Sequence, residues 1–270
     1  MRTAAGLVPS DTVRGRLHHK IGGYSQAVRW YRRLRPAWLW QRINPRGRIT
    51  RSYVGEQGLT VRHGPFAGMI YPRSAVGRVN FLPAKLLGSY ELELAPYLST
   101  GDWDIFADIG SGDGYFCVGM ARLHPGIKVI GYESDTAEQK FCQHLAEING
   151  TNVDVRGTAS FSDIHALPPG RLLLMVDIEG AEYELVNPEH SPRLREAAMI
   201  VELHWWVHED IGNILRARFS STHRIEVVEQ TARSLAGFPE LARWDEQSAY
   251  CATSEGRAHF GRWMVLTVKN

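Results

Sequence analysis

The sequence predicts an α/β fold in which helices cover both faces of a mostly parallel, seven-stranded sheet. Three observations support this prediction. From Asp102 onward, short apolar segments alternate with amphipathic segments of helical period. A glycine-rich loop at residues 110–114 follows the first apolar segment and precedes a helical one. Residues 172–176 are continuously apolar, which is typical of a strand buried on both faces of a sheet.

The composition is that of a globular protein. Of the 270 residues, 44% are hydrophobic and 22% are charged, which excludes a disordered or fibrous chain and allows one or two domains. The cysteines Cys117, Cys142 and Cys251 lie far apart without metal-ligand spacing, which argues against a disulfide framework and a zinc module. The sequence has no run of 18 apolar residues and no secretory signal, so we expect a cytoplasmic protein.

Charge is distributed unevenly along the chain. Residues 1–51 hold twelve Lys or Arg and a single acid, Asp11, for a charge of +11, and the remainder has a charge of −9. We therefore expect a basic, partly helical arm over residues 1–51 and a mildly acidic domain over residues 52–270. The acidic domain argues against specific binding of nucleic acid.

The arm contains one clear helical pattern. Residues 24–35 place apolar side chains at helical spacing with arginines on the outer face, and Pro36 begins a second short helix over 36–43. Residues 43–53 indicate a linker. Two interpretations of the basic helix stay open. It packs its apolar face on the domain, or it contacts an anionic surface such as the inner face of the membrane, where each basic residue contributes ~1 kcal/mol.

A hairpin and a lead-in helix are expected before the core, within residues 52–100. Residues 59–63 and 69–72 flank the turn sequence GPFAG and predict a small β-hairpin. Residues 85–98 repeat apolar side chains at helical spacing and predict one continuous helix.

The core, residues 101–270, alternates strands with helices. Apolar runs predict strands at 103–110, 128–133, 153–159, 172–177, 199–206, 225–230 and 262–270. Helical spacing predicts helices at 115–124, 136–149, from 180 onward, and 208–219. Pro125 and Gly126 end the first of these helices, and Gly150 takes the left-handed position after the second. The long segment 231–261 predicts either a lid beside the site or a structural cover.

The spacing of glycines in the loop distinguishes between classes of nucleotide-binding site. It follows Asp108 with the spacing G-x-G-x-G, and the position at which a dinucleotide fingerprint needs glycine holds Tyr115, which argues against a nicotinamide dehydrogenase. The second strand ends in Glu133, where a carboxylate accepts hydrogen bonds from both ribose hydroxyls of a nucleoside. Two alternative interpretations stay open: the glycine loop is only a tight turn, and Glu133 is only a solvated acid at a strand end.

Four motifs occur in order: DIGSGDGYF from Asp108, YESD from Tyr132, VDIEGAEYELV from Val176 and VELH from Val201. With this order and spacing, residues 80–206 resemble the S-adenosylmethionine-dependent methyltransferases of the FkbM type. The resemblance implies a Rossmann-like sheet, S-adenosyl-L-methionine as cofactor, and O-methylation of a glycan, glycolipid or polyketide-like acceptor.

The expected cofactor-binding residues follow the carboxyl ends of strands, where open α/β sheets bind their ligands. Backbone N–H groups of the loop face the methionine part of the cofactor, Asp108 holds its ammonium group, and Glu133 holds the ribose. The residues after the third strand contact the adenine edge, and Asp177 lies beside the methyl group. The full set is Asp108, Gly110, Ser111, Gly112, Gly114, Tyr115, Glu133, Ser134, Thr158, Ala159 and Asp177.

We expect His204, Asp177 and Glu202 to perform the catalytic work. His204 is the candidate general base, because an unperturbed pKa of ~6.5 leaves it mostly neutral at pH 7. Glu202 precedes it by two residues in a strand and therefore shares its face. Two alternatives stay open: a strand-end histidine with a structural role only, or a divalent cation held by these side chains with Glu179 and Glu182. Those two glutamates also favour a helix N-terminus without any catalytic role.

Other functions remain to be weighed against methyl transfer. A non-catalytic scaffold that binds the cofactor within a glycan or polyketide assembly system would not need the intact glycine loop, Glu133 and Asp177. Aminopropyl transfer would need further carboxylates for a polyamine. Trp205 and Trp206 follow the fifth strand, where they either stack on a sugar ring or close the sheet edge.

Overall fold

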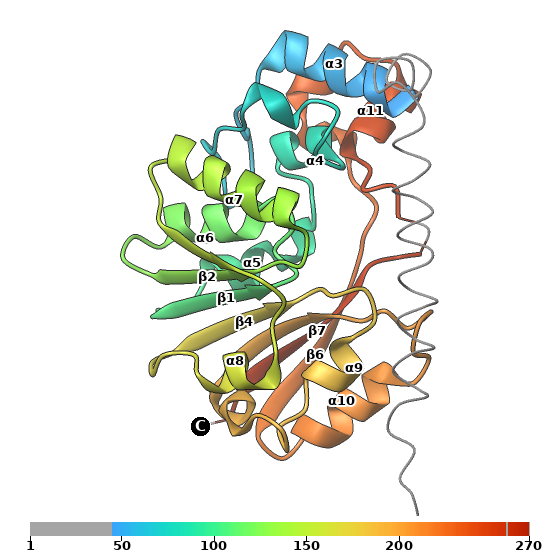
Figure 1. Ribbon diagram of the computed structural model, residues 1–270. Coiled ribbons are helices and arrows are strands. Elements are labelled where there is room, and N and C mark those ends of the chain that lie inside the picture. The colour runs from blue at the N-terminus through green and yellow to red at the C-terminus, as the bar shows by residue number, and fades with distance from the viewer. Residues whose placement is uncertain (1–44, 258, 270) are drawn as a thin grey trace, which may run out of the picture. The chain divides into compact units, whose positions relative to one another are not determined.

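The structure is a computed structural model that describes residues 45–257 and 259–269 (Figure 1). The helices expected at 24–35 and 36–43 lie outside the described residues, so the two interpretations of the arm stay predictions. Among the residues that the structure describes, no helix is long and apolar enough to cross a lipid bilayer.

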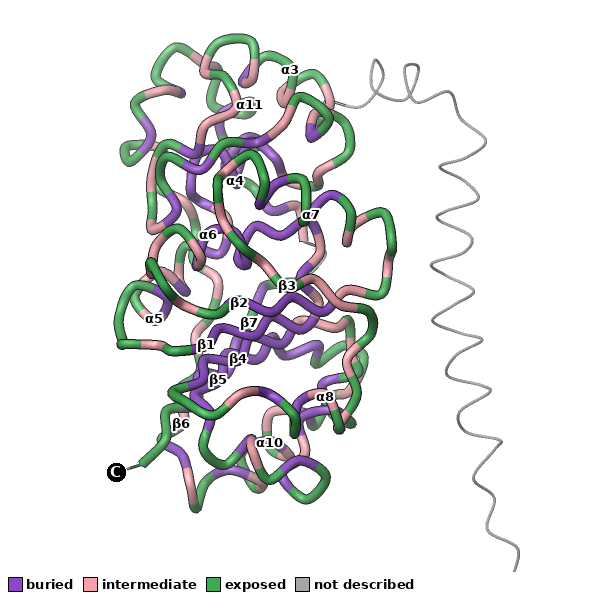
Figure 2. The backbone as a smooth tube through the Cα atoms, turned by 60° about the vertical axis from the view of Figure 1, so that its left-hand side comes forward, coloured by how far each residue is buried: buried purple, intermediate pink, exposed green. Residues whose placement is uncertain are grey.

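The predicted seven-stranded, mostly parallel sheet is confirmed. Strands β1 to β5 are parallel, and β7 runs antiparallel between β5 and β6, in the order β3-β2-β1-β4-β5-β7-β6. Buried residues fill the central strands along their length (Figure 2). The strands are β1 (Ile105–Ile109), β2 (Lys128–Tyr132), β3 (Val153–Arg156), β4 (Leu172–Val176), β5 (Ala198–Glu202), β6 (His223–Glu229) and β7 (Arg262–Val268).

The strand order reverses between β1 and β4. From β1 the chain moves outward through β2 to β3, and it returns to β4 on the opposite side of β1. The loops that follow β1 and β4 therefore leave the sheet in opposite directions, which opens a crevice at the carboxyl edge. The start of β7 reaches the same edge, because Trp263 pairs with Glu202 at the end of β5.

Two hydrophobic cores lie on the two faces of the sheet. Side chains alternate along β1, so that Phe106 enters the first core while Ile105 and Ala107 enter the second. Helices α6 (Tyr115–Leu123) and α7 (Thr136–Ile148) cover the first face, and α8 (Phe161–His165), α9 (Glu182–Leu185) and α10 (Ile211–Phe219) cover the second (Figure 1).

The linker expected at 43–53 is wrong for most of its length, because α3 occupies Pro45–Gln57. The tertiary contacts of this helix explain the difference. Tyr53 is fully buried and packs edge-on against Trp244 at 6.2 Å between ring centroids. The indole Nε1–H of Trp244 donates to Glu56 at 3.0 Å. These partners lie almost 190 residues away, so the local sequence does not reveal them.

The single helix expected at 85–98 is also wrong. The segment forms α4 (Leu82–Leu87), a 3-10 helix (Leu92–Leu94) and α5 (Ala95–Ser99). Gly88 ends α4 with φ +78°, and a Cβ there would lie 2.0 Å from the carbonyl oxygen of His63. The backbone contact therefore requires glycine and a break in the helix. The expected hairpin before it is reduced to one antiparallel bridge, between Thr60 and Ile70.

Further differences from the predictions concern the residues at which helices and strands begin and end. The fifth strand ends at Glu202, four residues earlier than expected, and the short helix α8 begins at a capping box on Ser160 that the sequence analysis did not use. Within 231–261 the chain forms 3-10 helices at Leu235–Gly237 and Pro239–Leu241, and then α11 (Glu246–Thr253). Two further 3-10 helices occupy Arg73–Ala75 and Pro192–Glu196.

Replacement by alanine should cause different losses of stability at two glycines of similar backbone conformation. Gly110 and Gly126 have φ values of +96° and +92°, but a Cβ at Gly110 would lie 1.7 Å from the carbonyl oxygen of Asp177, whereas nothing lies within 4 Å of one at Gly126. Gly110→Ala should lower the free energy of unfolding by about 3 kcal/mol or more. Gly126→Ala should cost only its backbone strain, about 1–2 kcal/mol. Urea denaturation measures both, and equal costs would contradict this account.

Candidate active site

The glycine loop is shaped by close backbone packing. Gly110, Gly112 and Gly114 all have positive φ, at +96°, +52° and +87°. A Cβ on Gly114 would lie 2.5 Å from Sγ of Cys142, so this position, like Gly110, tolerates no side chain. A Cβ on Gly112 would instead meet the carbonyl oxygen of Gly110 at 3.9 Å, an ordinary contact distance. Gly112 therefore keeps a cradle open where a ligand approaches the backbone.

A buried ion pair with a residue that precedes β1 in the sequence fixes the glycine loop. Nζ of Lys85 lies 2.6 Å from one carboxylate oxygen of Asp113, and the Tyr71 hydroxyl donates to the other at 3.0 Å. All three side chains are buried. Sequence analysis gave Asp113 no role, because its partners precede it by 28 and 42 residues.

Three predicted cofactor-binding residues differ in what they offer at the loop. Asp108 is buried, accepts a hydrogen bond from Sγ of Cys117 at 3.4 Å, and has its pKa raised to about 8 by burial. Ser111 Oγ is buried without a hydrogen-bond partner among the residues that the structure describes. The ring of Tyr115 packs in the core, 5.1 Å from that of Phe66, so its backbone alone borders the cradle.

Glu133 lies beside the loop, as expected of a residue at the end of the second strand. Its carboxylate accepts the N–H of Gly112 at 3.0 Å and the N–H of Asp135 at 2.7 Å, and the Ser134 hydroxyl donates to it at 3.3 Å. Thr158 and Ala159 follow β3, with Thr158 exposed and Ala159 packed against the second core. The structure thus brings Glu133 and Ser134 to the cradle through direct contacts, and it leaves Thr158 at the adjacent surface.

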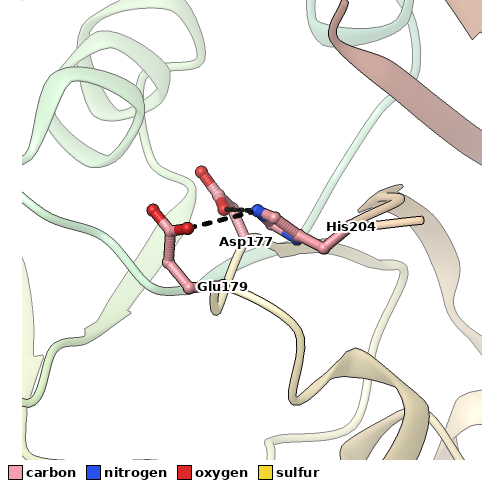
Figure 3. Close-up of side chains that lie close together, drawn as sticks. All are labelled: Asp177, Glu179 and His204. Carbon is pink, nitrogen blue, oxygen red and sulfur yellow. Dashed lines mark ion pairs between the residues drawn. The ribbon is translucent and has the colours of Figure 1, made fainter. Parts of the chain in front are cut away.

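His204 lies among the carboxylates of Asp177, Glu179 and Glu182, of which Figure 3 shows the first two. Its Nδ1 is 2.8 Å from Oε1 of Glu182, and its Nε2 is 3.6 Å from carboxylate oxygens of both Asp177 and Glu179. Glu182 is fully buried, and the same Oε1 accepts the backbone N–H of Ile178 at 2.9 Å. The position of Glu182 is therefore fixed, and it holds one side of the imidazole while Nε2 faces the acids at the edge of the site.

These carboxylates raise the pKa of His204. Burial lowers the pKa of the imidazole, but the nearby carboxylates of Glu182, Asp177 and Glu179 raise it further, so that its pKa lies above the usual value. The neutral fraction of the ring at pH 7 is therefore lower than an unperturbed pKa would give, and the role of His204 as general base stays a prediction. The ring is a stronger base than expected, and it reaches its neutral form at a higher pH.

Glu202 was expected to share a face with His204, and in the structure its carboxyl group pairs with Asp177. Burial and the neighbouring charge of Asp177 raise the pKa of Glu202 to about 10, so it keeps a proton and shares a hydrogen bond with Asp177. Nη1 of Arg257 contacts Glu202, Nη2 contacts Glu91, and Nε lies 2.7 Å from Glu255. A cation from the segment 231–261 thus reaches the carboxyl end of β5.

Sequence reasoning missed several of these residues. Glu182 was considered as a favourable charge at a helix N-terminus or as a metal ligand, and not as a partner of His204. Glu91, Glu255 and Arg257 lie outside every motif, and no sequence signal pairs them. The metal interpretation keeps a geometrical basis, because Asp177, Glu179 and His204 each place one ligand atom within 4.8 Å of the others.

No protein-family model and no curated protein sequence matches this chain. Several solved structures match it at low identity. A methyltransferase from Pyrococcus furiosus is 12% identical, with 84% of this chain and 98% of that chain covered and a TM-score of 0.46. An O-methyltransferase from Bacillus cereus in complex with SAH is 13% identical, with 83% and 90% covered and a TM-score of 0.43.

A third match is the O-methyltransferase TomG from Streptomyces achromogenes, which is involved in tomaymycin synthesis and was solved in complex with SAM. It is 12% identical, with 84% of this chain and 90% of that chain covered and a TM-score of 0.43. At this degree of likeness, the fold is assigned from the strand order of the chain itself. None of the three is described as FkbM type, so that finer resemblance stays a prediction.

Removal of the Glu182 charge should lower the pKa of His204. In Glu182→Gln the imidazole loses the carboxylate at 2.8 Å, whereas Glu184→Gln changes an exposed acid on the same helix and should leave the pKa unchanged. NMR titration of the His204 ring measures both. Because its folded pKa is raised, His204 stabilises the wild type below its unfolded pKa of ~6.5, and this stabilisation is lost as the pH rises through the folded value. The loss should begin at a lower pH in Glu182→Gln, and an unchanged His204 titration would contradict the assignment.

Proposed function

We propose that this chain is an S-adenosyl-L-methionine-dependent O-methyltransferase that modifies a hydroxyl of a glycan, glycolipid or polyketide-like acceptor. One observation carries the proposal. The crevice between β1 and β4 combines an open glycine cradle on one side with a carboxylate-held histidine on the other. The resemblance of residues 80–206 to FkbM-type methyltransferases supports the same function from the sequence.

The residues around the cradle fit a cationic cofactor. Asp108 is the last but one residue of β1 and Asp177 follows β4, and the pKa of each is raised by burial. A positive ligand would offset the cost of ionising these buried acids. Asp108 would hold the ammonium group, and Glu133 retains lone pairs for ribose hydroxyls beyond the two N–H groups that it accepts. When bound, the cofactor supplies an activated methyl group on a sulfonium sulfur.

His204 would remove the proton that an acceptor hydroxyl loses on methylation. Glu182 holds Nδ1, which leaves Nε2 to accept that proton. Asp177 and Glu179, each 3.6 Å from Nε2, would stabilise the imidazolium that forms. A non-catalytic scaffold would not need a buried histidine held by a buried carboxylate. This pair therefore favours the enzyme over the scaffold.

Cofactor binding should stabilise the fold through the cradle. S-adenosylmethionine or its demethylated product SAH at ~100 times Kd should add roughly 2.7 kcal/mol, or a rise of about 5–10 °C in melting temperature. Gly112→Val should abolish the rise, because its branched side chain would occupy the space beside the loop backbone that the cofactor needs. Differential scanning calorimetry measures both proteins. No shift and no heat of binding in the wild type would overturn the proposed function.

Binding should also release a proton near pH 7. Asp108 has a pKa of about 8 and is mostly protonated at pH 7, and an ammonium group beside it would lower that pKa. Up to about one proton should leave per SAH bound, and affinity should increase as the pH rises from 6 to 8. Titration calorimetry in buffers of different ionisation enthalpy counts the proton. Asp108→Asn should remove the proton that Asp108 releases. A heat of SAH binding to the wild type that does not depend on the buffer would contradict the role of Asp108 in holding the ammonium group.

Loss of the base should reduce turnover with little change in cofactor affinity. His204→Ala should lower methyl transfer by roughly 10²–10⁴-fold in a labelled-methyl assay on fractionated cell extracts. Wild-type activity should rise with pH through the raised pKa of His204, and the variant should lack that rise. His165→Ala, an exposed histidine on α8, is the control. If a chelator abolishes activity and Mg²⁺ restores it, the residues near Nε2 are metal ligands and the base assignment is wrong.

A further inference from the structure

A cavity of about 480 Å³ lies where the segment 231–261 leaves the sheet. This volume is within the range of ~300–1,000 Å³ that small-molecule sites occupy. Its walls come from the end of β6 and from both ends of that segment. Because β6 ends opposite Arg262, and Trp263 pairs with Glu202, the cavity opens at the same sheet edge as the crevice.

Two side chains connect the cavity to the candidate active site. Arg257 lines the cavity and contacts Glu202, which shares a hydrogen bond with Asp177. His259 also lines the cavity and stacks on Trp206, with ring centroids 4.6 Å apart and planes at 21°. Trp206 in turn lies edge-on to His204 at 5.0 Å. The cavity wall is therefore connected to His204 through His259 and Trp206, and to Asp177 through Arg257 and Glu202.

The arginines in the cavity wall are already neutralised. Arg257 forms ion pairs with Glu91 and Glu255, and it also contacts Glu202, which keeps its proton. Arg233 contacts Glu93, and its Nη2 lies 2.7 Å from Glu255. Neither guanidinium is left to bind a phosphate or carboxylate of a ligand. An anionic ligand would be desolvated beside these glutamates without a new partner, which is unfavourable.

Aromatic rings on the wall and at the mouth of the cavity remain exposed. Phe260 is 80% exposed and Tyr250 48%, and both line the cavity. Trp205 and Trp206 are more than a third exposed beside His259. Rings of this kind present apolar faces that pack against a flat ring with C–H groups, while neighbouring hydroxyls such as that of Ser254 remain available to polar groups.

We propose that this cavity is the acceptor subsite and that it takes an uncharged, hydroxyl-bearing ring, such as a neutral sugar unit, in preference to an anionic one. The proposal rests on the proposed function, because the subsite would deliver a hydroxyl to His204. It goes further in naming where the acceptor binds and in specifying its charge.

Two matched probes test the charge preference. Phenyl β-D-glucopyranoside and phenyl β-D-glucuronide share their rings and differ by the carboxylate. Saturation-transfer NMR with the full chain, in the presence of saturating SAH, should detect the glucoside, and the glucuronide should bind at least about tenfold more weakly. Equal or tighter binding of the glucuronide, or binding of neither probe, would overturn the proposal.

Two variants test the location. Phe260→Ala should raise the Kd of the glucoside about twofold to tenfold, as expected for one lost ring contact. Ser254→Trp should fill part of the cavity and abolish binding. Ile148→Ala removes an exposed apolar side chain from α7 and should change nothing. If both cavity variants bind the glucoside as the wild type does, the subsite lies elsewhere.

A separate titration distinguishes failure of this inference from failure of the proposed function. The Kd of SAH, measured by calorimetry on the same proteins, should be unchanged in Phe260→Ala and Ser254→Trp, since neither residue borders the glycine cradle. Wild-type protein that binds no SAH would overturn the proposed function. SAH binding together with unaltered glucoside binding in both cavity variants would overturn the acceptor subsite alone.

Discussion

The geometry of the site depends on one close backbone approach, that of Gly110 to the carbonyl group of Asp177. Here β1 and β4 remain paired to their last residues, with Ile109 opposite Val176 and the N–H of Asp177 donating to the carbonyl of Ile109 at 2.9 Å. Beyond this point the two chains diverge, one toward α6 on the first face and one toward α9 on the second. Because only glycine allows the approach, Gly110, the first residue after β1, fixes both where the crevice opens and where Asp177 lies.

A second constraint is the number of carboxyl side chains at the carboxyl edge of the sheet. Burying several carboxylates in one place is unfavourable unless each is protonated, paired or hydrogen-bonded. The structure uses all three solutions: Glu202 keeps a proton, Arg257 bridges three glutamates, and Glu182 accepts backbone N–H groups beside His204. Such an arrangement sacrifices stability in the free protein, and a cation bound in the crevice would restore part of it. The same charges that suit a cationic cofactor therefore disfavour an anionic acceptor.

The sequence predicted those parts of the molecule whose physical cause is local. Apolar runs located all seven strands, and the turn requirements of Gly110, Gly112 and Gly114 located the cradle. The predictions failed where a distant partner decides the outcome. Helix α3 is held by Trp244, and the break at Gly88 is required by the carbonyl of His63. The ion pairs of Arg257 with Glu91 and Glu202 span 166 and 55 residues, and no periodicity or spacing could pair them.

These long-range contacts divide the site into two parts with different origins. The crevice itself is built from the ends of β1, β2, β4 and the residues just beyond β5, all within the motifs. The groups that brace it come from the flanking segments: Lys85 and Tyr71 hold the loop through Asp113, and Arg257 holds the end of β5 through Glu202. The segment that supplies Arg257 also forms the cavity wall. A change in that segment that spares Arg257 would therefore alter the shape available to an acceptor, while the strand ends, and with them the cofactor side, keep their positions.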